Sequence, residues 1–432
     1  MILFYLLIAI MPLSAHRIWE TSLGSVTLFK WLGIACVLAA LFHLVQRTGP
    51  PPLFKTWQAR LFLFLYALVL LSYFSKTQAT EGWEVSPLAG WTSYFLLFFV
   101  TLTLVDSLRR LWWLVVVLVG SLAFASLYVI REWQKFRGVY PGFRTWGGVS
   151  GDPNYFSASA LIGVALAFCL IWEKQPRWAR WFFGGCLAIT LTALTIAASR
   201  GALLGLFAAF VVLVWRARRR FLFLAVGTVV LVLLMVFAPI APAERLLHPN
   251  YSDEEAAQNR EITWKAGMRM MGSAPWFGIG VGNYKGMVDK FEDEDAKVVS
   301  VAHNTYIEIG AELGLPALAI FLVILFLSFR SLERVRSQAL ESDDSVTERM
   351  AVGLQAALAG FGVSIVFLSA EYQRHLWFII FLSMCLPAIQ PDAPVETGEI
   401  EPEAPEETED VDDDLYAQWL AEDRDRGETR LR

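Results

Sequence analysis

The sequence has little charge: only 18% of its 432 residues are Asp, Glu, Lys or Arg, whereas 56% are hydrophobic. This scarcity and the repeated long apolar runs exclude a soluble globular protein and indicate a polytopic membrane protein whose constant partner is the lipid bilayer. Cysteine is also rare. The four cysteines lie inside apolar runs without CxxC or Cys/His spacing, so neither a disulfide framework nor a zinc site is expected.

Charge is distributed unevenly along the chain. Residues 391–432 hold 16 acidic and 4 basic residues, and the 25 acidic and 32 basic residues of the rest give it a net charge of +7. We therefore predict two parts, a transmembrane domain over residues 1–390 and a disordered acidic tail over residues 391–432. The first residues lack a basic start and a small-residue cleavage site, so we interpret them as a short first span.

Hydropathy predicts an all-α fold with about twelve transmembrane helices. The predicted spans are residues 2–14, 25–45, 60–75, 89–105, 111–131, 154–172, 181–198, 201–215, 221–240, 304–329, 350–370 and 375–390. Sixteen basic residues in the short loops 47–60, 109–110, 174–180, 216–220 and 330–349 fall on one side of this topology. The positive-inside rule makes that side the cytoplasm and places both termini there.

Residues 181–215 form an apolar run that is too long for one crossing. At about 1.5 Å per residue it would extend ~52 Å as a single helix, against ~30 Å of hydrocarbon. Both ends carry cytoplasmic basic clusters, so we predict a hairpin whose tip, Ser199-Arg200-Gly201, lies at the outer face. Arg200 is the only charged residue in the run. Because charge at membrane depth is costly, Arg200 is a functional candidate, the alternative being an interface anchor.

The outer loop 131–153 breaks the charge rule, because it includes Arg137 and Arg144 on the side where basic residues are scarce. This suggests an anionic ligand. The loop ends at Asp152-Pro153-Asn154, where Asp152 or Asn154 could cap the following helix. A simple capping role is at least as well supported as a chemical one for these two residues.

The longest polar segment, residues 241–302, is predicted as a large extracytoplasmic loop between helices 9 and 10. A capping-box pattern predicts a helix over residues 253–271 that lies along the membrane surface and carries Arg260. The run Gly278-x-Gly280-x-Gly282 has no preceding strand, so we interpret it as a tight turn and not as a nucleotide site. The acidic residues 292–295 are the one extracytoplasmic metal candidate, and a solvated loop explains them better.

His303 stands at the start of the tenth predicted span. Asn304, Glu308 and Glu312 recur every four residues and share one stripe of that span, in which Pro316 is expected to introduce a kink. A histidine at the positive end of a helix tends to be neutral, so its ring can accept a proton. The alternative is a capping or interface histidine.

Taken together, these motifs resemble the O-antigen ligase and polymerase family. The resemblance rests on Ser199-Arg200-Gly201, on Arg260-x-x-x-Trp264 before the glycine turn, and on His303-Asn304, and it covers residues 151–329. It implies a GT-C-like catalytic domain of the bacterial inner membrane with its site facing the periplasm. It also implies an undecaprenyl-diphosphate-linked glycan donor, Arg200 and Arg260 as diphosphate ligands, His303 as the base, and neither metal nor other cofactor.

The resemblance leaves the acceptor open. A lipid A core sugar would make the protein a ligase, another lipid-linked glycan repeat a polymerase, and a protein hydroxyl an O-glycosyltransferase. Arg137, Arg144, Asp152, Asn154, Asn304 and Glu308 are possible supporting residues, and no nucleic-acid partner is expected. A transporter or lipid-glycan flippase is the alternative from another class, since isolated charges in many spans would fit that too.

Overall fold

The computed structural model describes most of the membrane domain. The described residues are 1–13, 28–46, 52–76, 86–139, 144–147, 151–171, 177–217, 220–221, 224–225, 227–228, 251–293 and 300–389. The predicted acidic tail and residues 241–250 of the large loop lie outside them. Within these ranges the protein is helical and contains no strand, which confirms the all-α prediction.

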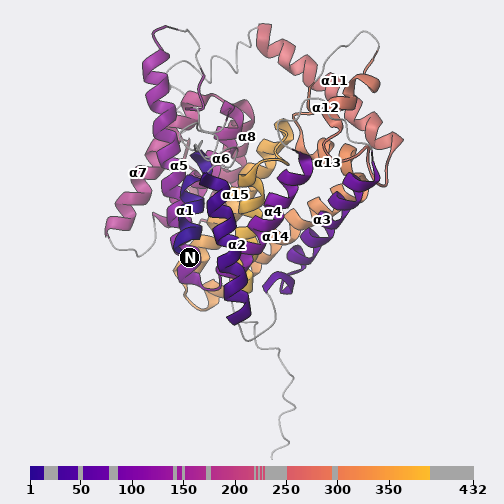
Figure 1. Cartoon of the computed structure of the whole chain (residues 1–432). Helices are drawn as coiled ribbons and strands as arrows, with labels where there is room; N and C mark the ends of the chain where they lie inside the picture. The colour runs from indigo at the N-terminus through magenta and orange to yellow at the C-terminus, as the bar shows by residue number, and fades with distance from the viewer. Residues whose placement is uncertain are drawn as a thin grey trace, which may run out of the picture. The chain divides into compact units, whose positions relative to one another are not determined.

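Eight helical segments within the described ranges are long and apolar enough to cross a membrane (Figure 1). They are α2 (Leu28–Gln46), α3 (Trp57–Ser75), α4 (Pro87–Leu104), α5 (Leu108–Phe136), α6 (Pro153–Leu170), α7 (Arg177–Ala197), α14 (Leu315–Glu341) and α15 (Ser345–Ser364) with the 3-10 turn η5 (Ile365–Phe367). Shorter helices include α1 (Ile2–Ile10), α8 (Arg200–Arg216) and α16 (Arg374–Ile389). The membrane prediction is confirmed. The number twelve stays a prediction, because the span at 221–240 falls almost entirely outside the described residues.

Helix α15 is a central element, packed against α6, α8 and α14 and buried over most of its length. Its contact with α8 is made through glycine. A Cβ atom on Gly205 would lie 2.4 Å from the carbonyl oxygen of Gly360. Small residues allow this close helix approach, which is a common way of packing helices in membranes. The contact fixes the first turn of α8 beside the last turn of α15.

The predicted break between α7 and α8 is confirmed. Helix α7 ends at Ala197, Ala198 has a left-handed φ of +47°, and α8 begins at Arg200. Ser199 caps α8, since its hydroxyl accepts a hydrogen bond from the backbone N–H of Ala202. Arg200 is therefore held at the start of a helix.

The predicted tenth span, residues 304–329, is wrong as a single kinked helix. The break comes at Gly314, with φ +88°, and it separates α13 (Thr305–Leu313) from α14. Pro316 lies in the first turn of α14, where a proline is tolerated because the missing N–H would have no helical partner. Only glycine adopts such a conformation without strain, so Gly314 and not Pro316 redirects the chain.

The glycine run forms the predicted tight turn, and this turn covers the end of α13. The backbone N–H groups of Ile279 and Gly280 donate to the carbonyl oxygens of Ala311 and Glu312 at 2.9 and 3.0 Å. Gly278, with φ +64°, allows the approach, because a Cβ atom there would lie 2.2 Å from the carbonyl carbon of Glu312. The turn thus binds helix carbonyls that would otherwise lack donors.

Helix α11 (Tyr251–Ser273) confirms the helix predicted over residues 253–271. Its buried face, which includes Thr263, Ala266 and Met270, packs on α13 and Tyr284. The interpretation that the apolar face of α11 lies on the membrane surface is therefore corrected, because that face is used for contacts within the protein. α11 and α13 lie together at one end of the helices (Figure 1).

Candidate functional site

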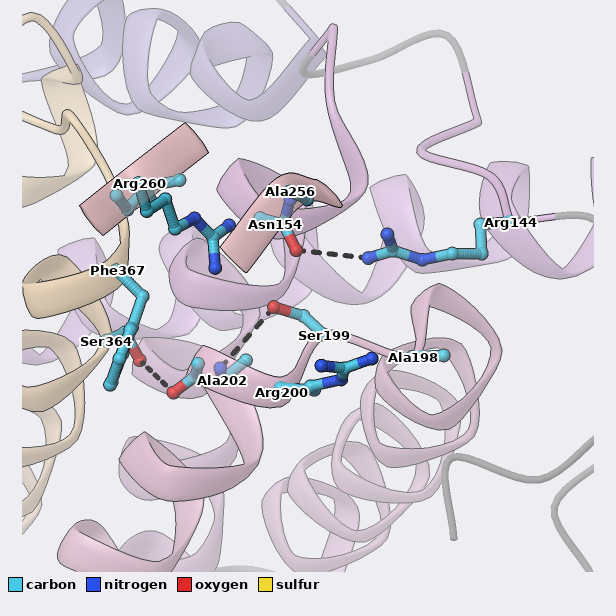
Figure 2. A pocket seen from close by; sticks show the side chains of 12 residues that line it. Arg144, Asn154, Ala198, Ser199, Arg200, Ala202, Ala256, Arg260, Ser364 and Phe367 are labelled. Atoms are coloured by element: carbon cyan, nitrogen blue, oxygen red, sulfur yellow. Dashed lines mark hydrogen bonds between the residues drawn. The ribbon is translucent and has the colours of Figure 1, made fainter. Parts of the chain in front are cut away.

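A cavity of about 190 Å³ opens where α6, α8, α11 and η5 meet (Figure 2). Four residues singled out from the sequence line it: Arg144, Asn154, Arg200 and Arg260. The remaining lining residues are Ala198, Ser199, Gly201, Ala202, Ala256, Ser364, Phe367 and Leu368. The basic residues that were predicted from three separate parts of the sequence are thus brought to one place.

Arg144 is fixed at the edge of the cavity by two hydrogen bonds. Its Nε donates to the carbonyl oxygen of Ala197 at 2.9 Å, and its Nη2 donates to Oδ1 of Asn154 at 3.0 Å. Arg137 lies elsewhere, at the end of α5, with its guanidinium 4.8 Å from the ring centre of Trp133. The basic loop therefore contributes one of its two candidate arginines to the cavity lining.

Arg200 and Arg260 are close enough to repel each other. Burial lowers the pKa of the Arg260 guanidinium, and the positive charge of Arg200 lowers it further. An arginine in a protein nevertheless stays protonated, so both side chains are cations. In Figure 2, Arg260 and Arg144 extend toward the cavity from opposite sides, with Arg200 below them. Such an arrangement favours an anion with several oxygens, of which phosphate groups are the common case.

Asp152 both caps α6 and supplies negative charge to the site. Its Oδ1 accepts hydrogen bonds from the backbone N–H groups of Asn154 and Tyr155 at 2.7 and 3.3 Å, which establishes the capping role. Its charge also raises the pKa of both Arg260 and His303. The two roles that the sequence left open for Asp152 are therefore compatible.

His303 lies in the loop before α13, beside Arg260 and Asp152. Burial is the main cause that lowers the pKa of its imidazole, and the charge of Arg260 lowers it again, whereas Asp152 opposes both. The ring is therefore neutral at pH 7 and has one nitrogen that can accept a proton. Asn304 caps α13, with Oδ1 accepting from the backbone N–H groups of Tyr306 and Ile307 at 3.0 and 3.2 Å.

The backbone of His303 is held in an unusual conformation by a second segment. Its φ of +49° is left-handed, which is uncommon for a residue other than glycine. The backbone N–H of His303 donates to Oγ of Ser369 at 2.9 Å, and the N–H of Thr305 donates to the carbonyl oxygen of Leu368 at 3.0 Å. The N–H of Ala370 donates back to the Thr305 hydroxyl at 2.8 Å. We call residues 302–305 and 368–370, joined in this way, the histidine clamp.

Glu308 lies beneath the histidine clamp and not in the cavity. It is fully buried and accepts a hydrogen bond from the hydroxyl of Ser369. The carboxyl group of Glu371, which is buried too, lies close enough to interact with it electrostatically. Both residues lie outside the membrane-spanning segments, and burial raises the pKa of both carboxyl groups. The negative charge of Glu308 raises the pKa of Glu371 further, because two neighbouring buried carboxylates disfavour each other's ionisation.

Ser369 and Glu371 were missed by the sequence analysis. Glu371 carried a usable signal, because it is the one acidic residue in the short connection 371–374 between the last two predicted spans, where Arg374 is the other charge. Ser369 carried no such signal in the sequence. The third residue of the predicted stripe, Glu312, is buried and accepts from the N–H of Tyr284 at 3.1 Å and the hydroxyl of Tyr372 at 3.2 Å, which is a structural role.

The acidic residues 292–295 were the metal candidate in the sequence, and the structure describes this segment as far as Asp293. Asp293 forms an ion pair with Arg269 on α11 at 2.6 Å. Among the residues that the structure describes, no three His, Cys, Asp or Glu side chains are grouped so that they could hold a metal ion.

We expect Ser369→Ala to loosen the loop that carries His303, because it removes a hydrogen bond to the His303 backbone and another to Glu308. Hydrogen–deuterium exchange of the purified protein should show faster exchange in peptides covering residues 300–306. Ser383→Ala is the matched control, since Ser383 is also buried but donates only to its own helix, to the carbonyl oxygen of Ile380. Equal exchange in the two variants would contradict a holding role for Ser369.

Comparison with known protein families finds a match in the middle of the chain. Residues 185–322, about a third of the chain, match the family model of O-antigen ligase. The matched region runs from α7 into α14 and includes Arg200, Arg260 and His303, whereas Asn154 and Ser369 lie outside it. A search of curated proteins returns no match. Residues 185–322 are therefore similar to the O-antigen ligase family, which confirms the resemblance predicted from the sequence motifs.

Proposed function

We propose that the protein transfers a glycan from an undecaprenyl-diphosphate carrier to an acceptor hydroxyl on the periplasmic side of the bacterial inner membrane. The observation that carries this proposal is the meeting of Arg200 and Arg260 beside the neutral imidazole of His303. The family match to O-antigen ligase supports the reaction class. We also propose that both termini lie in the cytoplasm, as the basic residues of the short loops predict.

The proposed reaction is a single inverting displacement. The acceptor oxygen bonds to the anomeric carbon of the donor while the bond from that carbon to the diphosphate oxygen breaks. The acceptor proton moves to His303, and the electron pair leaves with the diphosphate, whose charge Arg200 and Arg260 neutralise. General-base help of this kind is worth roughly 10² to 10⁴ in rate. Fixed cations placed where charge develops contribute at least a comparable factor.

The size of the cavity supports a division of the donor. At about 190 Å³ it is smaller than the ~300 to 1,000 Å³ typical of sites that enclose a whole small ligand. We therefore place only the diphosphate and the adjoining sugar carbon in the cavity. The lipid chain then lies in the bilayer and the rest of the glycan in water. The arginines are permanent cations, so this mechanism requires no divalent metal.

The acceptor is the part of the proposal with the least support. A lipid A core sugar, a second lipid-linked repeat and a protein hydroxyl all present the same reacting group to His303. The cavity residues contact the donor diphosphate in this mechanism, so they do not distinguish a ligase from a polymerase or a protein O-glycosyltransferase. To distinguish a ligase from a polymerase or a protein O-glycosyltransferase, each class of acceptor must be supplied in turn to the purified protein.

We expect purified protein in proteoliposomes to transfer glycan from the lipid-linked donor to one of these acceptors in the presence of excess chelator. His303→Ala should lower transfer at least 100-fold while donor binding stays normal, because the ring acts on the acceptor and not on the diphosphate. Glycan transfer and donor binding are both measured with radiolabelled donor. Transfer that stops with chelator and returns with magnesium would refute the arginine mechanism, and movement of unaltered donor across the bilayer would favour a flippase.

Arg200→Lys should lose most transfer activity although it keeps the charge. A compact ammonium group cannot make the two parallel hydrogen bonds that a guanidinium offers to a phosphate group. The matched control is Arg137→Lys, which alters an arginine on the same protein outside the cavity lining. Initial rates at saturating acceptor, with protein levels matched, measure the effect. Equal rates for the two variants would mean that Arg200 is only an interface anchor.

Asp152→Asn should extend activity toward lower pH. The negative charge of Asp152 raises the pKa of His303, so its removal lowers that pKa, and the ring then stays neutral in more acidic solution. Asparagine caps helices as well as aspartate does, so α6 is preserved. The acid limb of kcat/KM against pH measures the shift. Asp344→Asn, at the cap of α15, is the control and should leave the limb in place. A limb that moves toward higher pH in the Asp152 variant would contradict this assignment.

A further inference from the structure

Two aromatic side chains stand exposed in a turn that is otherwise buried. Trp276 is 71% and Phe277 54% exposed, whereas residues 278–284 directly after them are all buried. Large apolar groups exposed side by side cost free energy in water and mark a contact surface. Nothing in the proposed transfer reaction uses either residue.

The aromatic pair is continuous with the exposed face of α14. The backbone N–H of Leu315, in the first turn of α14, donates to the carbonyl oxygen of Pro275 at 2.8 Å. A Cβ atom on Gly314 would lie 2.6 Å from the carbonyl carbon of Trp276. Along α14 the exposed large apolar residues are Leu315, Leu322, Val323 and Phe326. Their spacing places them on one face of a candidate membrane span, so this face contacts lipid.

The exposed face of α14 has an uncharged stretch that is shorter than the hydrocarbon core of a bilayer. From Leu315 to Arg330, the next exposed charge, the helix rises about 22 Å, against ~30 Å of hydrocarbon. The aromatic pair lies beyond the N-terminal end of the helix and extends the apolar surface there. Tryptophan and other aromatic residues are typical of this level, where the hydrocarbon meets the headgroups.

We propose that Trp276 and Phe277 insert into the lipid–water boundary at the membrane face on which the cavity lies. The partner is the bilayer itself. The inserted turn is continuous with α11, because the N–H of Gly278 donates to the carbonyl oxygen of Ala274 at 2.9 Å, and it also covers the end of α13. Insertion therefore sets the depth of α11, and with it Arg260, relative to the headgroups. Insertion of the pair goes beyond the proposed transfer reaction and does not depend on it, whereas its effect on donor binding through Arg260 rests on that proposed function.

The position of the pair can be measured directly in the full-length protein. A bimane label is attached to Phe277→Cys and, as a control, to Lys265→Cys on the exposed face of α11. The four native cysteines are buried, and the parent protein measures their background labelling. In nanodiscs, the label at 277 should be quenched by phosphatidylcholine carrying a nitroxide high on its acyl chain and protected from aqueous iodide. The label at 265 should respond in the opposite way.

Two results would overturn the proposal. A label at 277 that iodide quenches as readily as the label at 265 would place the turn in water. Protection from both quenchers would mean that a protein surface, such as a second copy of this chain, covers the pair. Because the fluorescence experiment needs no turnover, its outcome is independent of the transfer activity.

A second measurement tests the link between insertion and the site. The double variant Trp276→Ser with Phe277→Ser should raise the apparent KM for lipid-linked donor several-fold in proteoliposomes, with kcat little changed. Replacement of both residues by leucine keeps the apolar surface and should restore the KM. An unchanged KM in the serine variant would overturn the idea that insertion sets the depth of Arg260.

Discussion

The hydrogen bonds at the two ends of α13 are the interactions on which the rest of the site depends. A helix of nine residues is too short to be stable alone, and each of its ends exposes backbone groups without helical partners. At its start, Asn304 and the histidine clamp supply those partners. At its end, the glycine turn does so. Because residues 368–370 and the glycine turn are distant in sequence from α13, this helix joins α11, α14 and the 368–371 connection into one unit. That unit positions His303.

Charge balance is the second constraint. The half-buried guanidinium groups of Arg200 and Arg260 repel each other, and removing a cation from water is costly unless negative charge is near. Among the described residues, Asp152 supplies one negative charge against the three arginines Arg144, Arg200 and Arg260 that line the cavity, so excess positive charge remains there. The negative charge of a bound diphosphate would offset this excess positive charge. Burial keeps the pKa of His303 low and its ring neutral, and the charge of Arg260 lowers that pKa further. In the proposed mechanism, a cation that binds the leaving group therefore also helps to keep the base neutral.

The sequence predicts those features of the site that follow from local rules. The break at Ser199, the helix that carries Arg260 and the turn at Gly278 to Gly282 are all present, because a lone charge, a capping pattern and clustered glycines act over a few residues. The break at Gly314 was assigned to Pro316, since a glycine within an apolar run gives no sign of its φ until a partner turn is in place. The buried face of α11 was assigned to lipid because hydropathy does not distinguish lipid from a protein surface.

The residues that hold His303 escaped prediction for a different reason. Ser369 is one serine among many, and its role exists only because residues 368–370 pair with residues 302–305 across some sixty positions of sequence. The family domain at residues 185–322 contains Arg200, Arg260 and His303, whereas Asn154, Ser369 and Glu371 lie outside it. In the proposed mechanism, reacting groups and their supports thus come from different parts of the chain. In that mechanism, changes in residues 368–371 can alter how His303 meets its acceptor while Arg200 and Arg260 stay in place.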